Sequence, residues 1–233
     1  MSLSGTLGNL SSMEAPRITL GRMQNPVRGF LHGIAAVAAV FATAFLWFVS
    51  PSWGVRIGAV VFGLAMIALY TTSSLYHAIP WADTWKKRMQ RLDHSMILVL
   101  IAGTYTPVAI VALDGTMRWT ALFVAWALVS VGAIQHAFFP RDNQTFSMIL
   151  AISMGWLGVA FAWRFVPALG WIGTGLAIAG GLVYSIGMLG LVTNRPRLWP
   201  RVFSYHEVFH IMVVTASVIH FVMVWRYVLP RAG

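Results

Sequence analysis

Two histidines with helical spacing stand out in a sequence that is otherwise poor in ionisable groups. His206 and His210 are four residues apart. On an α-helix they therefore project from one face, about 40° apart at roughly 100° per residue. Imidazole nitrogens are good ligands for Zn²⁺, and this spacing allows both to bind one ion. The sequence contains no cysteine, so any metal must be held by histidine, carboxylate or water.

A third ligand and a carboxylate can come from two other segments. His77 lies near the end of one apolar stretch, four residues after Ser73, and Asp93 opens the next. His77 could complete a three-histidine set, and Asp93 could hold a water at the open fourth position of a catalytic zinc site. We therefore predict Zn²⁺ ligands at His77, His206 and His210, with Asp93 beside them. The Ser73 hydroxyl could take part or could bond its own helix backbone, as serine does in membrane helices.

The segment from His206 to His210 supports a second interpretation. It also matches the H-E-x-x-H pattern of zinc metalloproteases, in which Glu207 would be the general base. Short patterns of this kind arise by chance, and an intramembrane protease would be expected to use Asp or Glu, rather than His77, as its third ligand. The protease interpretation stays open as an alternative.

The other four histidines are expected to be structural. His32 and His136 should lie in the membrane interface or pack with a hydrogen bond. His94 points about 100° away from its neighbour Asp93 on a helix. His220 lies ten residues beyond His210, which is too deep to reach the same metal, so we expect it to make a hydrogen bond in the core.

The amino-acid composition indicates the kind of fold that must hold the candidate metal ligands in place. Of the 233 residues, 58% are hydrophobic and 9% are charged, whereas a soluble domain has about 25% charged residues. This excludes soluble enzymes, nucleic-acid-binding modules and disordered tails. Seven uncharged windows are each close to the roughly 20 residues that span about 30 Å of hydrocarbon. We predict an all-α polytopic membrane protein, a bundle of seven transmembrane helices at about residues 30–49, 56–79, 93–113, 118–139, 145–165, 168–192 and 204–227, with Pro167 dividing the fifth from the sixth.

The distribution of charge predicts the orientation of this bundle. If the N-terminus is cytoplasmic, eleven of the 16 Lys and Arg residues lie inside and five outside, in keeping with the positive-inside rule. The C-terminus is then outside. Residues 1–24 are expected to be a flexible cytoplasmic tail, and residues 25–233 a single membrane domain. This topology brings His77, Asp93 and the His206/His210 pair to one depth on the cytoplasmic side.

Three ordered motifs resemble the haemolysin III branch of the progestin and adipoQ receptor family. They are Thr71-Thr72-Ser73-Ser74-Leu75-Tyr76-His77, then Leu92-Asp93-His94-Ser95 leading to Ile101-Ala102-Gly103-Thr104-Tyr105-Thr106-Pro107, and then His206/His210 with Val218-Ile219-His220-Phe221. Asn25 and His32 also sit where bacterial members of that family tend to have Asn and His. The resemblance covers roughly residues 25–228.

The resemblance implies a seven-helix bundle with its N-terminus inside. It also implies that His77, His206 and His210 bind zinc, with Ser73 and Asp93 around the metal-bound water. The family does not require glutamate at position 207, which weakens the protease interpretation. Its eukaryotic adiponectin receptors are linked to ceramide hydrolysis, and the wider superfamily includes alkaline ceramidases.

These inferences lead to one expected function and two further alternatives. We expect a zinc-dependent hydrolase of a membrane lipid, cleaving an amide-type bond as a ceramidase does and contributing to membrane homeostasis. It would be a multi-pass protein of a bacterial inner membrane, with membrane lipid and no nucleic acid as its partner. The first alternative is a non-enzymatic sensor or regulator of membrane state with structural zinc. The second is a pore-forming haemolysin, although a pore should be lined by polar or charged residues and these spans carry few.

Overall fold

The structure is a bundle of long helices. It is a computed structural model that describes residues 23–138, 144–199 and 202–232. Those residues form α1 (Pro26–Val49), α2 (Trp53–Ala78), α3 (Asp83–Ala112), α4 (Gly115–Phe138), α5 (Gln144–Trp156), α6 (Ala162–Thr193) and α7 (Tyr205–Met223). The short helical segments η1 (Leu157–Phe161), η2 (Val224–Val228) and η3 (Leu229–Ala232) follow α5 and α7. Within the described residues there is no β-strand, only an isolated bridge between Trp199 and Phe203.

The surface of the bundle is apolar enough to face lipid. Six helical stretches in the described residues are long and apolar enough to cross a membrane, and one of them is the 48-residue stretch Phe146–Thr193. Large apolar side chains on different helices point outward, among them Phe48 and Trp171 (each 80% exposed) and Phe123 (74% exposed). Soluble monomers rarely expose apolar surface on this scale. The predicted all-helical membrane protein is therefore confirmed.

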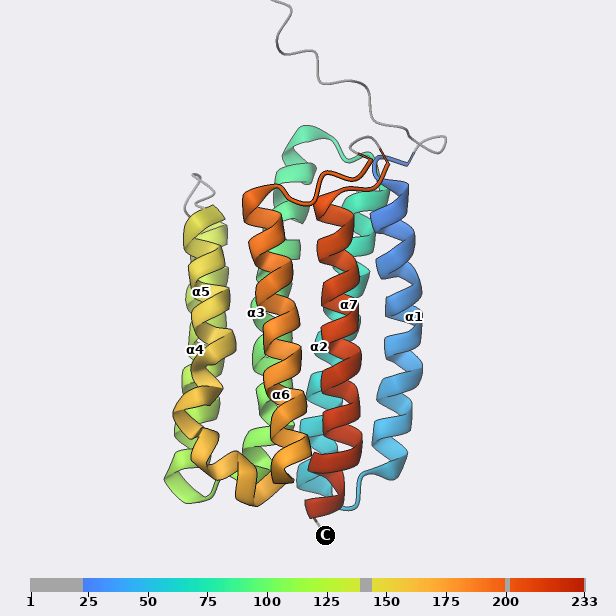
Figure 1. Cartoon of the computed structure of the whole chain (residues 1–233). Helices are drawn as coiled ribbons and strands as arrows, with labels where there is room; N and C mark the ends of the chain where they lie inside the picture. Colours follow the sequence, from blue (N-terminus) through green and yellow to red (C-terminus); the bar gives the residue numbers. More distant parts are fainter. Residues whose placement is uncertain (1–22, 139–143, 200–201, 233) are drawn as a thin grey trace, which may run out of the picture.

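Neighbouring helices in the chain pack against each other, and one further contact closes the core. α1 packs on α2, α2 on α3, α3 on α4 and α6 on α7, while α7 also contacts α1. Figure 1 shows α4 and α5 at one edge of the bundle and α1 at the other. The C-terminus of α2 and the N-terminus of α7 lie on the same side of the bundle, close to the start of α1 (Figure 1). The topology thus gathers the first, second and seventh helices around one point.

Small residues bring α2 and α3 close together. A Cβ atom on Gly103 of α3 would lie 2.6 Å from the Cβ of Ala65 on α2, and one on Gly58 would lie 3.1 Å from the Cα of Pro107. A real Cβ atom would clash at these distances, so the two helices can approach this closely only because glycine has no side chain. Small residues are commonly found where helices pack closely in membranes. Ser73 on α2 and Asp93 on α3 are carried by this tightly packed pair.

Two predicted helix boundaries were wrong. α3 begins at Asp83 rather than at residue 93, so Asp93 lies inside the helix and does not open it. Residues 86–91, four of which are basic, lie between the two predicted spans 56–79 and 93–113, but they continue α3 beyond the apolar span. Pro167 does not divide the fifth helix from the sixth either. α5 ends at Trp156, and α6 contains Pro167 and bends at Gly170, where φ is 74°.

The bend at Gly170 has a plain steric reason. A positive φ with an extended ψ of 171° is accessible almost only to glycine, which lacks the Cβ that would clash. Between Trp156 and Gly170 the chain changes direction, and α6 then runs back opposite to α5 (Figure 1). The 48-residue apolar stretch is therefore not one straight helix.

The predicted N-terminal tail lies mostly outside the described residues, since the structure describes it only from residue 23. The described part of this tail is hydrogen-bonded to the C-terminal end of α2. The backbone N–H of Gln24 donates to the carbonyl of Ala78 (3.2 Å), and that of Asn25 donates to the carbonyl of His77 (2.9 Å). These bonds fix the start of α1 beside His77. The division into residues 1–24 and 25–233 stays a prediction.

Candidate metal centre

Three imidazoles converge where α2 and α7 meet. One ligating nitrogen each from His77, His206 and His210 can be chosen so that all three lie within 4.8 Å of one another. The ring of His77 lies 5.3 Å from that of His206 and 4.8 Å from that of His210, measured between ring centroids. His77 and His210 are buried, and His206 is half-buried. The sequence separation of four on α7 and the packing of α7 near α2 together produce this cluster.

The cluster includes a buried nitrogen without a protein partner. His77 Nε2 is buried and makes no hydrogen bond within the described structure. Leaving a buried polar atom unsatisfied costs about 1–3 kcal/mol, so such an atom calls for a partner. Three neighbouring imidazoles with no thiolate among them are a donor set that suits Zn²⁺. The residues present therefore fit a zinc ion.

Ser73 and Asp93 form a second pair close to the cluster. Ser73 lies one helical turn before His77 on α2 and is 2% exposed, while Asp93 on α3 is 9% exposed. The Ser73 hydroxyl is placed to donate a hydrogen bond to the Asp93 carboxyl. The structure thus gives Ser73 a polar partner on the next helix rather than only its own backbone.

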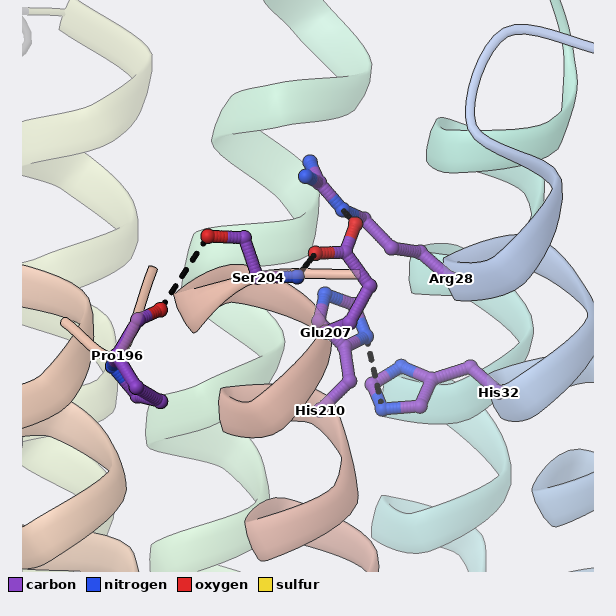
Figure 2. Close-up of polar contacts among 6 residues, drawn as sticks. All are labelled: Arg28, His32, Pro196, Ser204, Glu207 and His210. Carbon is purple, nitrogen blue, oxygen red and sulfur yellow. Dashed lines mark hydrogen bonds and ion pairs between the residues drawn. The ribbon is translucent and has the colours of Figure 1, made fainter. Parts of the chain in front are cut away.

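His32 of α1 also reaches this centre, which the sequence analysis did not foresee. His32 Nε2 lies 3.1 Å from His210 Nδ1, at hydrogen-bond distance, and both rings are buried (Figure 2). The expected packing of His32 with a hydrogen bond is confirmed, but its partner is one of the candidate ligands. A bond at Nδ1 leaves Nε2 of His210 as the nitrogen that can face a metal.

Glu207 serves the architecture of α7 rather than the histidine cluster. Its Oε1 forms an ion pair with Arg28 Nε at 2.6 Å, and its Oε2 accepts a hydrogen bond from the Ser204 backbone N–H at 2.8 Å (Figure 2). The Ser204 hydroxyl donates to the carbonyl of Pro196 at 3.3 Å. Both carboxylate oxygens are therefore occupied at the start of the helix, as in a capping box. This arrangement removes the free general base that the protease interpretation needs.

One sequence signal could have revealed the contribution of α1. Arg28 and His32 are four residues apart, so they share a face of α1, and their partners Glu207 and His210 are three apart on α7. Residues three or four apart are neighbours on a helix surface. Two polar residues at helical spacing, near the same end of the bundle as the predicted metal ligands, indicate a shared polar interface.

Two of the three remaining histidines are structural, as predicted. The His136 ring nitrogens pair with Ser95 Oγ (2.8 Å) and Ser147 Oγ (2.7 Å), which joins α3, α4 and α5. His220 Nε2 donates to the carbonyl of Ala177 at 3.3 Å and joins α7 to α6. His94 lies beside His136, with ring centroids 6.0 Å apart, and is no member of the three-histidine cluster.

An apolar cavity begins next to the candidate site. It has a volume of about 280 Å³ and lies among α3, α5, α6 and α7. Three of its lining residues, Leu69, Ile97 and Phe209, lie within one helical turn of Ser73, Asp93 and His210 respectively. The lining of the cavity thus comes within about one helical turn of the candidate site on α2, α3 and α7.

Comparison with known proteins assigns the chain to a family. The model of the family described as Haemolysin-III related matches residues 21–221. The chain belongs to this family. Hemolysin-3 of Bacillus cereus is 35% identical over 87% of this chain and 90% of its own length, and the Hemolysin-3 homolog of Bacillus subtilis is 31% identical over 84% and 90%. Human monocyte to macrophage differentiation factor is 23% identical over 85% and 82%.

The matched region of this haemolysin III-related protein contains every residue of the cluster and of its α1 support. The bacterial relatives are matched over 90% of their own length, so the similarity covers most of both chains. The resemblance seen in the three sequence motifs is therefore confirmed as family membership.

Replacing Glu207 with glutamine tests the structural role of its carboxylate. The Glu207→Gln variant should lower the free energy of unfolding by about 3 kcal/mol, because Arg28 loses a buried carboxylate partner. Thermal unfolding in detergent measures this loss. Asp114→Asn is the matched control, since the Asp114–Arg118 pair is 3.7 Å long and Asp114 is 82% exposed, so its loss should not be measurable. Equal stability of Glu207→Gln and the wild type would contradict the assigned role.

Proposed function

We propose that this haemolysin III-related protein binds Zn²⁺ through His77, His206 and His210 and hydrolyses an amide-type bond in a membrane lipid. The observation that carries the proposal is a three-histidine cluster, with two of its rings buried, within about one helical turn of the lining of an apolar cavity. A lipid chain has the right chemistry for the cavity, and a metal has the right chemistry for the cluster. Turnover of this kind would contribute to membrane homeostasis.

The proposed topology has seven crossings, with the N-terminus in the cytoplasm and the C-terminus outside. α5 and α6 run in opposite directions (Figure 1), so the 48-residue stretch that contains them would cross twice. The basic residues 86–91 lie at the start of α3, at the same end of the bundle as the histidine cluster. The positive-inside rule favours the cytoplasm for this end, in the plasma (inner) membrane of a bacterium.

The residues around the cluster can perform amide hydrolysis. Zinc bound there would lower the pKa of a water molecule toward about 7 and polarise the scissile carbonyl. Asp93 is the general base that accepts the proton from the attacking water, and it then gives that proton to the leaving amine as the C–N bond breaks. Ser73, as a hydrogen-bond donor to Asp93, holds the carboxyl in position. His32 fixes the ring of His210 through the bond between Nε2 and Nδ1.

The lining of the cavity indicates which class of substrate would fit. Its lining is dominated by Leu, Ile, Val, Ala and Phe side chains, which match an acyl chain and offer little to a polar headgroup. With the chain in the cavity, the bond next to it would lie beside Asp93 and the histidines. The substrate could thus reach the site without leaving the bilayer.

A structural role for zinc is the second candidate, and one observation favours it. The cluster joins α2 to α7, and His32 extends the connection to α1. Zinc at this point would clamp three helices that are distant in sequence, as structural zinc does in small domains. A protein of this kind would respond to the state of the membrane without turning over a lipid.

The contact between His32 and His210 leads to a prediction on metal affinity. His32→Ala should weaken zinc binding by about 10- to 100-fold, the usual effect of removing the partner that orients a ligating histidine. Competition with a chromophoric chelator measures the affinity on purified protein. His136→Ala removes a buried histidine outside the cluster and should leave the affinity unchanged. Unaltered affinity in His32→Ala would show that this contact does not orient the ligand.

Replacing Asp93 with asparagine separates the two candidate functions. Asp93→Asn should retain zinc but lower turnover by at least about 100-fold, because the general base is lost. Release of fatty acid from vesicles containing an N-acyl lipid, followed by mass spectrometry, measures turnover. Asp114→Asn is the control and should keep turnover, since Asp114 is 82% exposed and its ion-pair partner is Arg118, outside the histidine cluster. Equal turnover in Asp93→Asn and the wild type would refute the role of Asp93, whereas a wild type without turnover that unfolds on chelation would favour the structural candidate.

A further inference from the structure

The end of the cavity beside Thr174 and His220, ten residues along α7 from His210, carries two polar atoms without partners. Thr174 of α6 and His220 of α7 both line the cavity and are 6% and 8% exposed. Thr174 Oγ1 and His220 Nδ1 are buried and make no hydrogen bond within the described structure. Hydrocarbon offers no substitute partner, and an unsatisfied buried polar atom is costly.

Other polar side chains that line the cavity are satisfied by the protein. The hydroxyl of Thr104 donates to the carbonyl of Leu100, and that of Ser185 donates to the carbonyl of Gly181. The Tyr184 hydroxyl pairs with the Ser217 hydroxyl at 2.7 Å. The two unpartnered atoms are therefore a local exception at one end of an otherwise satisfied cavity wall.

The backbone explains why Thr174 is an exception. Serine and threonine in these helices commonly donate to the carbonyl four residues earlier, as Thr104 and Thr106 do. For Thr174 that residue is Gly170, whose φ of 74° and ψ of 171° take it out of the helical conformation. The bend at Gly170, inside α6, thus removes the usual acceptor for the Thr174 hydroxyl. That hydroxyl is then available to a ligand in the cavity.

The tautomer of His220 follows from its one hydrogen bond. Because a carbonyl can only accept, His220 Nε2 carries the proton that it donates to Ala177. In a neutral ring, Nδ1 is then an acceptor. Gly180 leaves the space that the ring occupies, since a Cβ there would overlap it. Thr174 lies three residues before Ala177, and so about one turn along α6 from the carbonyl that holds the His220 ring.

We propose that this end of the cavity binds a hydroxyl group carried along the acyl chain of the lipid. A hydroxyl can accept from Thr174 and donate to His220 at once, whereas an ether or carbonyl oxygen can only accept. The proposal rests on the proposed function, because the lipid is placed with its polar end at the zinc cluster.

The position of this hydroxyl along the chain follows from helix geometry. His210 and His220 are ten residues apart, which is about 15 Å along α7. With C–C bonds of about 1.5 Å, an extended hydrocarbon chain advances about 1.3 Å per carbon. A polar end at the cluster therefore brings roughly the twelfth carbon to Thr174 and His220. The proposed substrates are therefore lipids with a hydroxyl near the twelfth carbon of the acyl chain.

A pair of matched fatty acids tests this subsite directly. 12-Hydroxystearate and stearate compete with a fluorescent fatty acid for the zinc-loaded, full-length protein in detergent. We expect 12-hydroxystearate to bind about tenfold more tightly, because it satisfies two buried polar atoms that stearate leaves unpaired. Equal affinity of the two fatty acids, or tighter binding of stearate, would overturn the proposal without any variant being needed.

Two threonine variants assign the preference to this end of the cavity. Thr174→Val keeps the side-chain volume and should abolish most of the preference for 12-hydroxystearate. Thr104→Val is the matched control, because Thr104 lines the same cavity but already donates to Leu100, and the preference should persist. A preference that survives in Thr174→Val would overturn the assignment.

Removal of the zinc cluster separates this proposal from the proposed function. The variant carrying His206→Ala and His210→Ala should bind both fatty acids more weakly and by the same factor, so that their affinity ratio stays near ten. If it binds both fatty acids as the wild type does but keeps the ratio, the hydroxyl subsite stands and the placement of the lipid head at the zinc fails. A ratio that falls to one would overturn the subsite.

Discussion

Hydrocarbon offers no hydrogen-bond partner, so each polar atom buried in this bundle must be satisfied by another part of the chain or by a ligand. Most of the polar side chains described above meet this requirement between helices. His136 is held by Ser95 and Ser147, and the Tyr184 hydroxyl by Ser217. The exceptions are therefore informative. Eight buried side-chain atoms of the described residues have no hydrogen-bond partner. Among them, His77 Nε2 lies in the histidine cluster, and Thr174 Oγ1 and His220 Nδ1 lie in the cavity.

The same constraint explains why the first helix is part of the site. Arg28 and Glu207 would be costly if buried separately, and together they fix α1 against the start of α7. With that register set, the next turn of α1 brings His32 to His210. The ion pair and the histidine contact are thus one interface between α1 and α7 that holds a candidate ligand in a single orientation, as Figure 2 shows.

The sequence predicted correctly those features that depend on residue type alone or on the spacing of residues along a helix. Uncharged windows of sufficient length predicted membrane helices, and the spacing of His206 and His210, with His77 at the same depth, predicted side chains that the structure brings together. It failed where tertiary contacts decide. Nothing local in the sequence says that the charged residues 86–91 stay helical or that Gly170, rather than Pro167, bends the chain. The partners of His32 and Glu207 lie about 180 residues away, and metal binding itself stays a prediction.

The metal content of the purified protein decides whether the three-histidine cluster binds zinc. Elemental mass spectrometry on detergent-purified wild type, prepared without chelators, is compared with the variant carrying His206→Ala and His210→Ala and with His136→Ala. The account predicts about one zinc per chain in the wild type and in His136→Ala, and none in the double variant, because only the latter removes two imidazoles of the cluster. Wild type without metal, or a double variant that keeps its zinc, would contradict the account.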